Sequence, residues 1–247
     1  LEALGTLEAL SSLAALSADH PDWCFPGITE NDGGLRVAGK GMGHPLLPPA
    51  TCVRNDVDVG PQGSFLYVTG SNMSGKSPLL RAVGLNAVLA QAGGPVCAEG
   101  MKLDSVRVHT SMRTADSVTE GVSQYMAELN RIRKVVEGAR EEADQGVLYL
   151  LDEPLQGTNE AERRIAVQTI LGHLLDAGAI GAVATHDLQL DSTDRLQPAA
   201  RAVHLEGAVR EGDDGPLITF DYLLQPGRAT STNALALLRA VGLGECT

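Results

Sequence analysis

Short apolar runs alternate with amphipathic segments along most of this chain. Most of the runs are rich in β-forming residues and apolar at nearly every position, which is typical of strands buried on both faces of a parallel sheet. They are 65–68, 106–109, 147–151 and 180–184. The segments with apolar residues at helical spacing are 79–89, 121–136 and about 160–176. This alternation predicts an α/β domain with a mainly parallel sheet flanked by helices.

Two further regions predict antiparallel strands. Residues 19–63 are rich in Pro, Gly and Asp, and we expect them to form a small antiparallel β flap that leads into the first buried strand. A closing pair of strands is expected near the end of the chain, around a turn at Gly212–Gly215. The predicted strands are 34–38 and 57–59 in the flap, and 202–205 and 217–220 in the closing pair.

Both ends of the chain carry helical patterns. Leu recurs at every third position from Leu1 to Leu16, which favours a helix with a slowly drifting apolar stripe. The first residue is not Met, so we expect this helix to be the end of an upstream helical domain. A self-contained helix docked on the main domain is the alternative. Residues 231–241 form a second amphipathic pattern that is expected to cap the domain or pack on a partner.

The strongest motif directly follows the first buried strand. It fits G-x-x-x-x-G-K-[ST] and precedes a helix, the context that makes this pattern a phosphate-binding loop. Its residues are Gly70, Ser71, Asn72, Met73, Ser74, Gly75, Lys76 and Ser77. The glycines let several backbone N–H groups face one anion, and the helix N-terminus adds its positive dipole end. Lys76 is expected to reach the β- and γ-phosphates, and the Ser77 hydroxyl to bind Mg²⁺.

Pro78 follows this motif in the first turn of the predicted helix. Proline is tolerated there because the N–H that it lacks would have no helical partner. In a phosphate loop, however, those spare N–H groups contact the ligand, so one donor is missing. Proline also disfavours the α conformation of the residue before it, here Ser77. We therefore expect nucleotide affinity to be weakened rather than abolished.

Two more strand ends carry candidate chemistry. Asp152 and Glu153 end the run at 147–151, and His186 follows the run at 180–184. Ligands of open α/β sheets bind at the carboxyl ends of the strands. Asp152 is expected to hold Mg²⁺, Glu153 to polarise the attacking water, and His186 to sense the γ-phosphate. His44 in the flap region is more simply a structural residue that lines the nucleotide pocket.

Composition narrows the classes of function. The chain has 247 residues, is 43% hydrophobic and carries a net charge of −12, so it makes a poor clamp for a nucleic acid by itself. Aromatic residues make up only 3%, which disfavours stacking on bases as the main binding mode. The four cysteines are scattered and no apolar run is long enough for a membrane span, so we expect reduced thiols and a cytoplasmic protein without membrane contact.

Taken together, these motifs resemble the C-terminal ATPase domain of the MutS family of DNA mismatch-repair proteins, an ABC-type P-loop NTPase. The resemblance covers nearly the whole chain. The segments that carry it are TGSNMSGKS (69–77), GVSQYMAE (121–128), LLDEPLQGTNEAER (150–163), ATHDLQL (184–190), His44-Pro45 and Pro226-Gly227. Three departures stand out: Pro78 replaces a threonine, Glu99 a glutamine, and Gln156-Gly-Thr-Asn the family's R-G-T-S. The last of these suits a MutS-related branch.

The resemblance implies an obligate pair of subunits with two ATP sites across the interface, formed with a second copy or a MutS-like partner. Ser123 of one subunit would then approach the γ-phosphate held by the other, and the Gly157–Asn159 loop would lie at the same interface. The implied division is an upstream lever end at 1–18, the ATPase domain at 19–225 and a dimerisation region at 226–247. DNA would be bound through domains absent from this chain.

Three alternatives remain beside a Mg²⁺-dependent ATPase that couples ATP state to clamp motion. The first is a nucleotide-gated assembly module that binds ATP or ADP with little or no hydrolysis, which Pro78 favours. A transporter-type ABC ATPase is disfavoured because the L-S-G-G-Q signature is missing. A generic P-loop kinase is weaker still, because no acceptor pocket or lid segment is recognisable.

Overall fold

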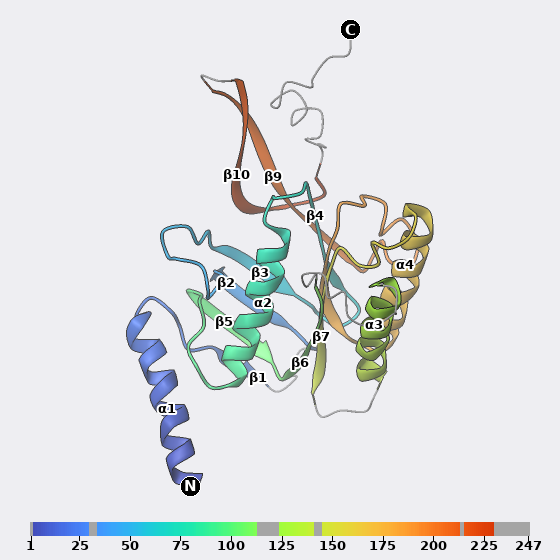
Figure 1. The fold of residues 1–247 in the computed structure, drawn as a ribbon. Coiled ribbons are helices and arrows are strands. Elements are labelled where there is room, and N and C mark those ends of the chain that lie inside the picture. The colour runs from blue at the N-terminus through green and yellow to red at the C-terminus, as the bar shows by residue number, and fades with distance from the viewer. Residues whose placement is uncertain (1, 30–33, 113–123, 141–144, 213–214, 230–247) are drawn as a thin grey trace.

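The computed structural model describes residues 2–29, 34–112, 124–140, 145–212 and 215–229. Its helices are α1 (Glu2–Asp19), α2 (Lys76–Gln91), α3 (Gln124–Arg140) and α4 (Glu160–Asp176). Together with two β-sheets they form an α/β domain (Figure 1). Within these residues, no helix is both long and apolar enough to cross a membrane. The helical pattern predicted at 231–241 and the first part of that at 121–136 lie outside the described residues.

The larger sheet is mainly parallel, as predicted. Its strands are β4 (Phe65–Gly70), β6 (Val106–Ser111), β7 (Gly146–Asp152), β8 (Ile180–Ala184), β9 (Ala200–Gly212) and β10 (Gly215–Pro226). Their order is β10-β9-β4-β8-β7-β6, and only β10 runs antiparallel to its neighbour. The order places β8 between the strand before the glycine-rich loop and the strand that ends in the two carboxylates. The candidate segments that follow β4, β8 and β7 therefore lie next to one another at the carboxyl ends of these strands.

The flap was predicted only in part. The smaller sheet contains β1 (Gly27–Thr29), β2 (Val37–Met42), β3 (Asn55–Val59) and β5 (Gly100–Asp104), in the order β1-β5-β2-β3. The antiparallel pairing of β2 with β3 was expected. However, β5 enters the sheet from beyond α2, and β1 pairs with it in parallel. β1 is exposed at every position and so has no apolar pattern, and in β5 only Met101 and Leu103 alternate with exposed Lys102, which is a weak signal in five residues.

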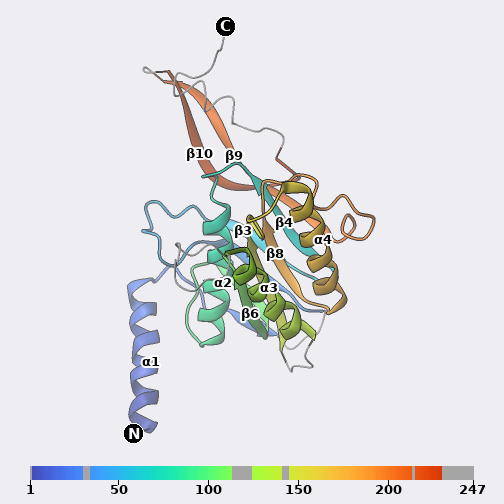
Figure 2. The ribbon, with the colours of Figure 1, turned by 45° about the vertical axis from the view of Figure 1, so that its right-hand side comes forward.

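Alternate residues of the central strands face two separate cores. Leu66 and Val68 of β4 join the cluster beneath α2 and the flap, whereas Phe65 and Tyr67 join the cluster beneath α3 and α4. Strand side chains alternate between faces, so a sheet covered on both sides needs strands that are apolar throughout. The result is a layered domain with the sheet between α2 and the α3–α4 pair (Figures 1 and 2).

Two elements project from this body. The β9–β10 hairpin is longer than the predicted closing strands and rises beyond the sheet, with Gly212 paired to Gly215 (Figure 1). The predicted helix at the chain start is present as α1, but it extends away from the domain and has no buried residue (Figure 2). Leu4, Leu7 and Leu10 are each more than half exposed. Its role as the end of an upstream lever stays a prediction.

Candidate nucleotide site

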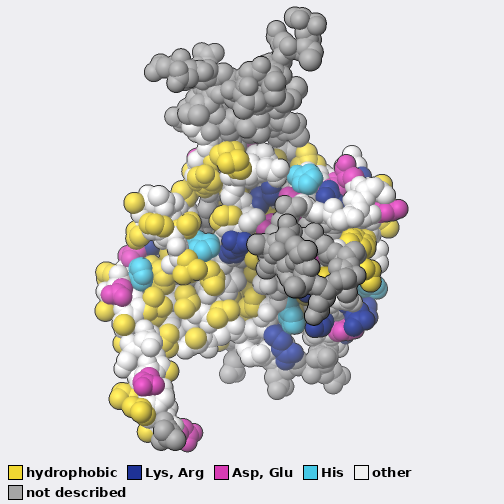
Figure 3. Space-filling view, viewed as in Figure 1, with side chains coloured by type: hydrophobic (Ala, Val, Ile, Leu, Met, Phe, Trp, Pro, Cys, Tyr) yellow, Lys and Arg dark blue, Asp and Glu magenta, His cyan; other side chains and the backbone are white. Residues whose placement is uncertain are grey.

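One cavity of about 640 Å³ lies beside the glycine-rich loop and the carboxylate strand end. This volume falls in the usual range for small-molecule sites. The predicted site residues among its lining are Asn72, Met73, Ser74, Gly75, Lys76, Ser77, Asp152 and Glu153. Hydrophobic side chains are frequent over the α2 half of the molecule, and charged side chains gather over the α3–α4 half (Figure 3). The residues of the glycine-rich loop and the two carboxylates form one end of the cavity, which we call the phosphate end.

The conformation of the loop explains its glycines. Gly70 and Gly75 have φ angles of 149° and 101°, a region that side chains strongly disfavour. A β-carbon at Gly70 would collide with the carbonyl oxygen of Leu205, and one at Gly75 would lie 2.9 Å from the Tyr222 ring. Met73 adopts φ 69° between them. The chain thus curls tightly in front of the α2 N-terminus, where free N–H groups and the helix dipole attract anions.

Lys76 is buried within this curl. Its Nζ atom donates hydrogen bonds to the carbonyl oxygens of Gly70 at 2.8 Å and Ser71 at 3.0 Å. The same atom lies 3.6 Å from Oε1 of Glu153. Only 6% of the lysine side chain is exposed, so its charge is concentrated on the cavity rather than dispersed in water.

Several buried oxygen atoms at this end have no hydrogen-bond partner among the described residues. They include the Ser71 and Ser74 hydroxyls and Oδ1 of Asp152. An unpaired buried polar group costs about 1–3 kcal/mol, so native proteins seldom keep several of them together without a reason. Ser74 and Asp152 line the cavity together with Lys76, so a phosphate and its cation bound there would give partners to these two groups.

Ser77 is helical, although Pro78 was expected to disfavour the α conformation at this position. Both residues belong to α2, and the first helical hydrogen bond runs from the Leu79 N–H to the Gly75 carbonyl at 3.0 Å. This bond closes the turn around Ser77 and Pro78, and its strength outweighs the local preference of the pre-proline residue. Ser77 and Pro78 both line the cavity, so the missing Pro78 N–H remains relevant to binding.

Glu153 is held in a strained conformation directly after β7. Its φ of 48° is unusual for a residue with a side chain, and strain of this kind concentrates at functional sites. The Glu153 N–H donates to the Ala184 carbonyl at 2.9 Å, which ties it to the end of β8. Neither carboxylate oxygen has a hydrogen bond within the described ranges, and the side chain is 12% exposed.

His186 stands beside this carboxylate. Its Nδ1 lies 2.9 Å from Oε2 of Glu153, an ion-pair distance without the alignment of a hydrogen bond. The ring is about half exposed, and Nε2 lies 3.4 Å from Arg163 on α4. His186 does not line the cavity itself. The structure therefore brings Lys76, Glu153 and His186 into one chain of contacts.

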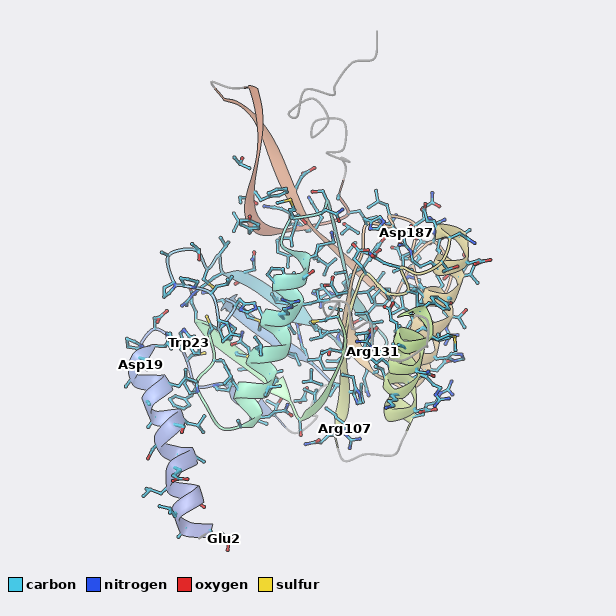
Figure 4. All side chains as sticks on the ribbon, in the orientation of Figure 1. Glu2, Asp19, Trp23, Arg107, Arg131 and Asp187 are labelled. Carbon is cyan, nitrogen blue, oxygen red and sulfur yellow. The ribbon has the colours of Figure 1, made fainter. Side chains whose placement is uncertain are left out.

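The turn that carries His186 is fixed by its neighbour Asp187. Figure 4 shows Asp187 beside α4 at the carboxyl ends of the strands, whereas Arg107 lies at their opposite ends. Arg164 donates to both Asp187 oxygens, at 2.7 and 3.0 Å, and the buried Tyr67 hydroxyl donates to the Asp187 carbonyl. Burial alone would raise the pKa of Asp187, but the Arg164 hydrogen bonds, the Gln189 N–H and the positive charges of Arg164 and Arg163 together lower that pKa.

The loop after Glu153 is held by α3 and α4. Leu155, at φ 58°, donates its N–H to Oε1 of Glu128 at 2.9 Å. A β-carbon at Gly157 would lie 2.9 Å from Tyr125, so only glycine permits this approach. Asn159 caps α4 by accepting the Glu162 N–H at 2.9 Å. Parts of the motif at 121–128 thus contact the carboxylate loop within the same subunit.

The other end of the cavity was largely missed from the sequence. We call it the base end; its lining residues are Met42, His44, Leu47, Thr51, Val53, Asn55 and Tyr222. His44 was expected to line the pocket, and it does. Asn55 reaches across to β10, donating to the Tyr222 carbonyl at 3.0 Å and accepting the Leu224 N–H at 2.7 Å. Tyr222 has φ 57° in a bulge of the hairpin, where no local pattern marks it.

The remaining predicted features are either outside the described residues or away from the cavity. Ser123 and the region from 230 onward lie outside the described residues. Glu99 is exposed and lies 3.8 Å from Lys40, and it does not line the cavity. The predicted residues Gly70 and Ser71 shape the loop from behind rather than line the cavity.

The fold and the site define an α/β protein in which a glycine-rich loop, a buried lysine and two strand-end carboxylates share one cavity. Comparison with known families then identifies its relationship. The family model described as MutS domain V matches residues 66–245, and the chain belongs to the MutS family.

Individual relatives agree with this assignment. The chain is 33% identical over 98% of its length to DNA mismatch repair protein MutS 2 of Halobacterium salinarum, covering 27% of that protein. It is 34% identical over 99% of its length to Endonuclease MutS2 of Thermus thermophilus, covering 31% of it. It is 30% identical over 99% to DNA mismatch repair protein MSH6 of Arabidopsis thaliana, covering 19%. The chain therefore spans a third or less of these relatives.

Proposed function

We propose that this chain is the ATP-binding and ATP-hydrolysing dimerisation domain of a MutS-like DNA-repair or recombination protein, with the fold of an ABC-type P-loop NTPase. The observation that carries the proposal is the convergence at the phosphate end. A buried lysine, the unpaired Ser74 hydroxyl and an unpaired Asp152 oxygen lie at the cavity beside the N-terminus of α2. A polyphosphate with its cation satisfies all of these groups at once.

The available donors suit Mg²⁺. Asp152 and Ser77 offer oxygen atoms, which this hard cation prefers, and both line the cavity. No group of three or more His, Cys, Asp or Glu side chains gathers among the described residues. Mg²⁺ commonly relies on one or two carboxylates plus substrate phosphates, so this small donor set fits. When bound, the ion would neutralise charge on the phosphates.

The protein's own groups would carry the remaining work. Lys76 stabilises negative charge on the terminal phosphates, and the loop N–H groups orient them. Glu153 orients the attacking water and takes its proton, since its carboxylate has no hydrogen-bond donor among the described residues. His186 reports the presence of the γ-phosphate through its contact with Glu153.

Glu153→Gln is the direct test of hydrolysis. The amide keeps the shape of the side chain but cannot accept the proton, so we expect ATP to bind and turnover to fall by about 100-fold or more. Phosphate release and the dissociation constant of ATP, measured on the same samples, check this. Wild-type turnover in the variant would remove Glu153 from the mechanism.

Pairing is tested by sedimentation with Mg²⁺, with and without a slowly hydrolysed ATP analogue. By resemblance, Ser123 would act on the nucleotide of the partner, so the analogue should convert monomer to dimer. Ser123→Ala should bind the analogue but fail to pair. Coupling to a DNA clamp, through a lever that ends at residue 18, and the tail from 226 as a dimerisation region belong to the same proposal.

The alternative is a nucleotide-gated assembly module with negligible hydrolysis. Pro78, which removes one N–H from the phosphate end, is the observation that favours it. Steady-state phosphate release separates the two functions. The module would pair on ATP without turnover even with Glu153 intact.

A further inference from the structure

We propose that His44 and Thr51 select adenine over guanine at the base end of the cavity. His44 would donate a hydrogen bond to N1 or N7, the ring nitrogens on either side of the 6-amino group, and Thr51 would accept one from that amino group. This inference rests on the proposed function and goes beyond it, because the phosphate loop alone does not distinguish one nucleoside triphosphate from another.

The proton of His44 has a defined place. Nδ1 accepts the backbone N–H of Leu46 at 3.1 Å. An amide N–H can only donate, so Nδ1 must carry a lone pair and the ring proton must be on Nε2. Burial, followed by the positive charge of Arg81, lowers the pKa of His44, although the backbone of His44 itself opposes the shift. The ring is therefore neutral and offers one donor, Nε2–H.

Thr51 offers the opposite character. Its Oγ1 donates to the Pro48 carbonyl at 3.2 Å. A hydroxyl has one hydrogen, so this bond leaves only lone pairs for a ligand. The Thr51 backbone N–H also donates to the Pro48 carbonyl, at 3.0 Å, which keeps the side chain beside that acceptor. Thr51 thus presents an acceptor to the cavity that it lines.

One compact loop brings the two side chains to the same wall. The Leu47 N–H donates to the His44 carbonyl at 3.0 Å, and the Cys52 thiol lies 3.8 Å from the same carbonyl. Residues 51 and 52 therefore fold back beside His44. The side-chain amide of Asn55 is occupied by β10, as described above. The Tyr222 hydroxyl can both donate and accept, so it does not discriminate between the bases.

This pair of groups matches adenine. Adenine carries a donor at its 6-amino group and acceptors at the ring nitrogens on either side, N1 and N7. Guanine has an acceptor, O6, in place of the amino group. O6 would face the lone pairs of Thr51. Binding guanine would require the hydroxyl to turn and abandon Pro48, and we expect about a tenfold loss of affinity from that one hydrogen bond.

The experiment measures dissociation constants of the full chain with Mg²⁺ for ATP, GTP, ITP, 1-deaza-ATP and 7-deaza-ATP. ITP keeps O6 without the guanine 2-amino group, and each deaza nucleotide removes one ring acceptor. For the wild type we expect ATP to bind about tenfold more tightly than ITP and GTP, and more tightly than one of the deaza analogues. The analogue that loses affinity identifies the nitrogen that His44 contacts.

Two variants assign each half of the discrimination. Thr51→Val should bring ATP and ITP to similar affinities while the deaza effect persists. His44→Leu should remove the deaza effect. Leu46→Ala, at a residue of the same loop that is 77% exposed, is the matched control. It should keep both the preference for ATP over ITP and the loss of affinity for the deaza analogue. Equal binding of ATP and ITP by the wild type, or no effect of either deaza substitution, would overturn the inference while leaving the proposed function intact. Failure of every nucleotide to bind would overturn both.

Discussion

The two ends of the cavity are built in different ways. At the phosphate end, eight consecutive residues from Gly70 to Ser77 form the loop, and the carboxylates sit at the end of β7, a parallel strand separated from β4 by β8 alone. At the base end, the wall comes from the 42–55 segment and from Tyr222 near the end of the chain. The two parts are joined by Asn55, whose partners are 167 and 169 residues away.

This difference separates binding strength from the choice of ligand. The phosphate end is charged, buried and rigidly specified by backbone geometry, which suits strong binding of any triphosphate. The base end is apolar with a few oriented polar groups, which suits selection. Changes at the first end should therefore affect every nucleotide alike, and changes at the second should depend on the base.

Removing the buried positive charge of Lys76 should have the largest effect on nucleotide affinity. In Lys76→Ala the phosphates lose a charge-assisted hydrogen-bond donor. We expect the affinities for ATP and GTP to fall together by about 1000-fold. Titration of both nucleotides measures this. Lys40→Ala is the control, because Lys40 is a largely exposed lysine outside the cavity. A loss confined to ATP would contradict the division between the two ends.

Restoring the missing N–H should have the next largest effect. Pro78→Thr returns one donor to the α2 N-terminus, and a hydrogen bond to a charged group is worth about 1.5–3 kcal/mol. ATP should then bind about 10- to 100-fold more tightly. Pro78→Ala restores the N–H without a hydroxyl and should behave in the same way. An unchanged dissociation constant in both variants would show that this N–H does not contact the nucleotide.

The two hydrogen bonds of Asn55 at the base end should contribute less to nucleotide affinity. Asn55→Leu removes two hydrogen bonds that hold the Tyr222 bulge, and we expect ATP affinity to fall about tenfold. The rate of turnover at saturation should stay near wild type, because the phosphate end is untouched. Asn55→Asp keeps the acceptor for Leu224 and should lose only part of the affinity. A collapse of turnover instead would mean that the two ends are not separable.

The Asp187 network should have the smallest effect, seen in stability. Arg164→Gln leaves a buried carboxylate without its partner, and we expect a loss of about 1 kcal/mol at neutral pH, since Arg164 is itself partly exposed. The folded pKa of Asp187 is lowered, so its contribution is present above the unfolded value of about 3.9 and fades as pH falls through the folded pKa.

Urea unfolding of wild type and variant at pH 7 and below pH 4 checks this prediction. The difference should shrink as the pH falls toward and through the lowered folded pKa of Asp187, because the carboxylate then becomes protonated. Arg133→Gln removes an exposed pair with Glu137 on α3 and should change stability by less than the buried pair does. A pH-independent loss would point to packing rather than charge.

The sequence alone predicted the central strands, the helices after them and the residues at the phosphate end. Those features follow from local periodicity and from motifs of consecutive residues. The strands β1 and β5 were not recognised, because their burial depends on partners elsewhere in the chain. The pre-proline expectation for Ser77 was wrong, because the helical bond from Leu79 to Gly75 determines that turn.

Apolar runs and the spacing of Gly, Lys and Asp by themselves determined an α/β fold with a glycine-rich loop and two carboxylates at the carboxyl ends of its strands. Tertiary structure decided the rest: the order that places β8 between β4 and β7, the contact of His186 with Glu153, and the meeting of Asn55 with Tyr222. Periodicity reports which face of an element is buried. Only the packed chain reports what it is buried against, because contacts between distant residues leave no local pattern.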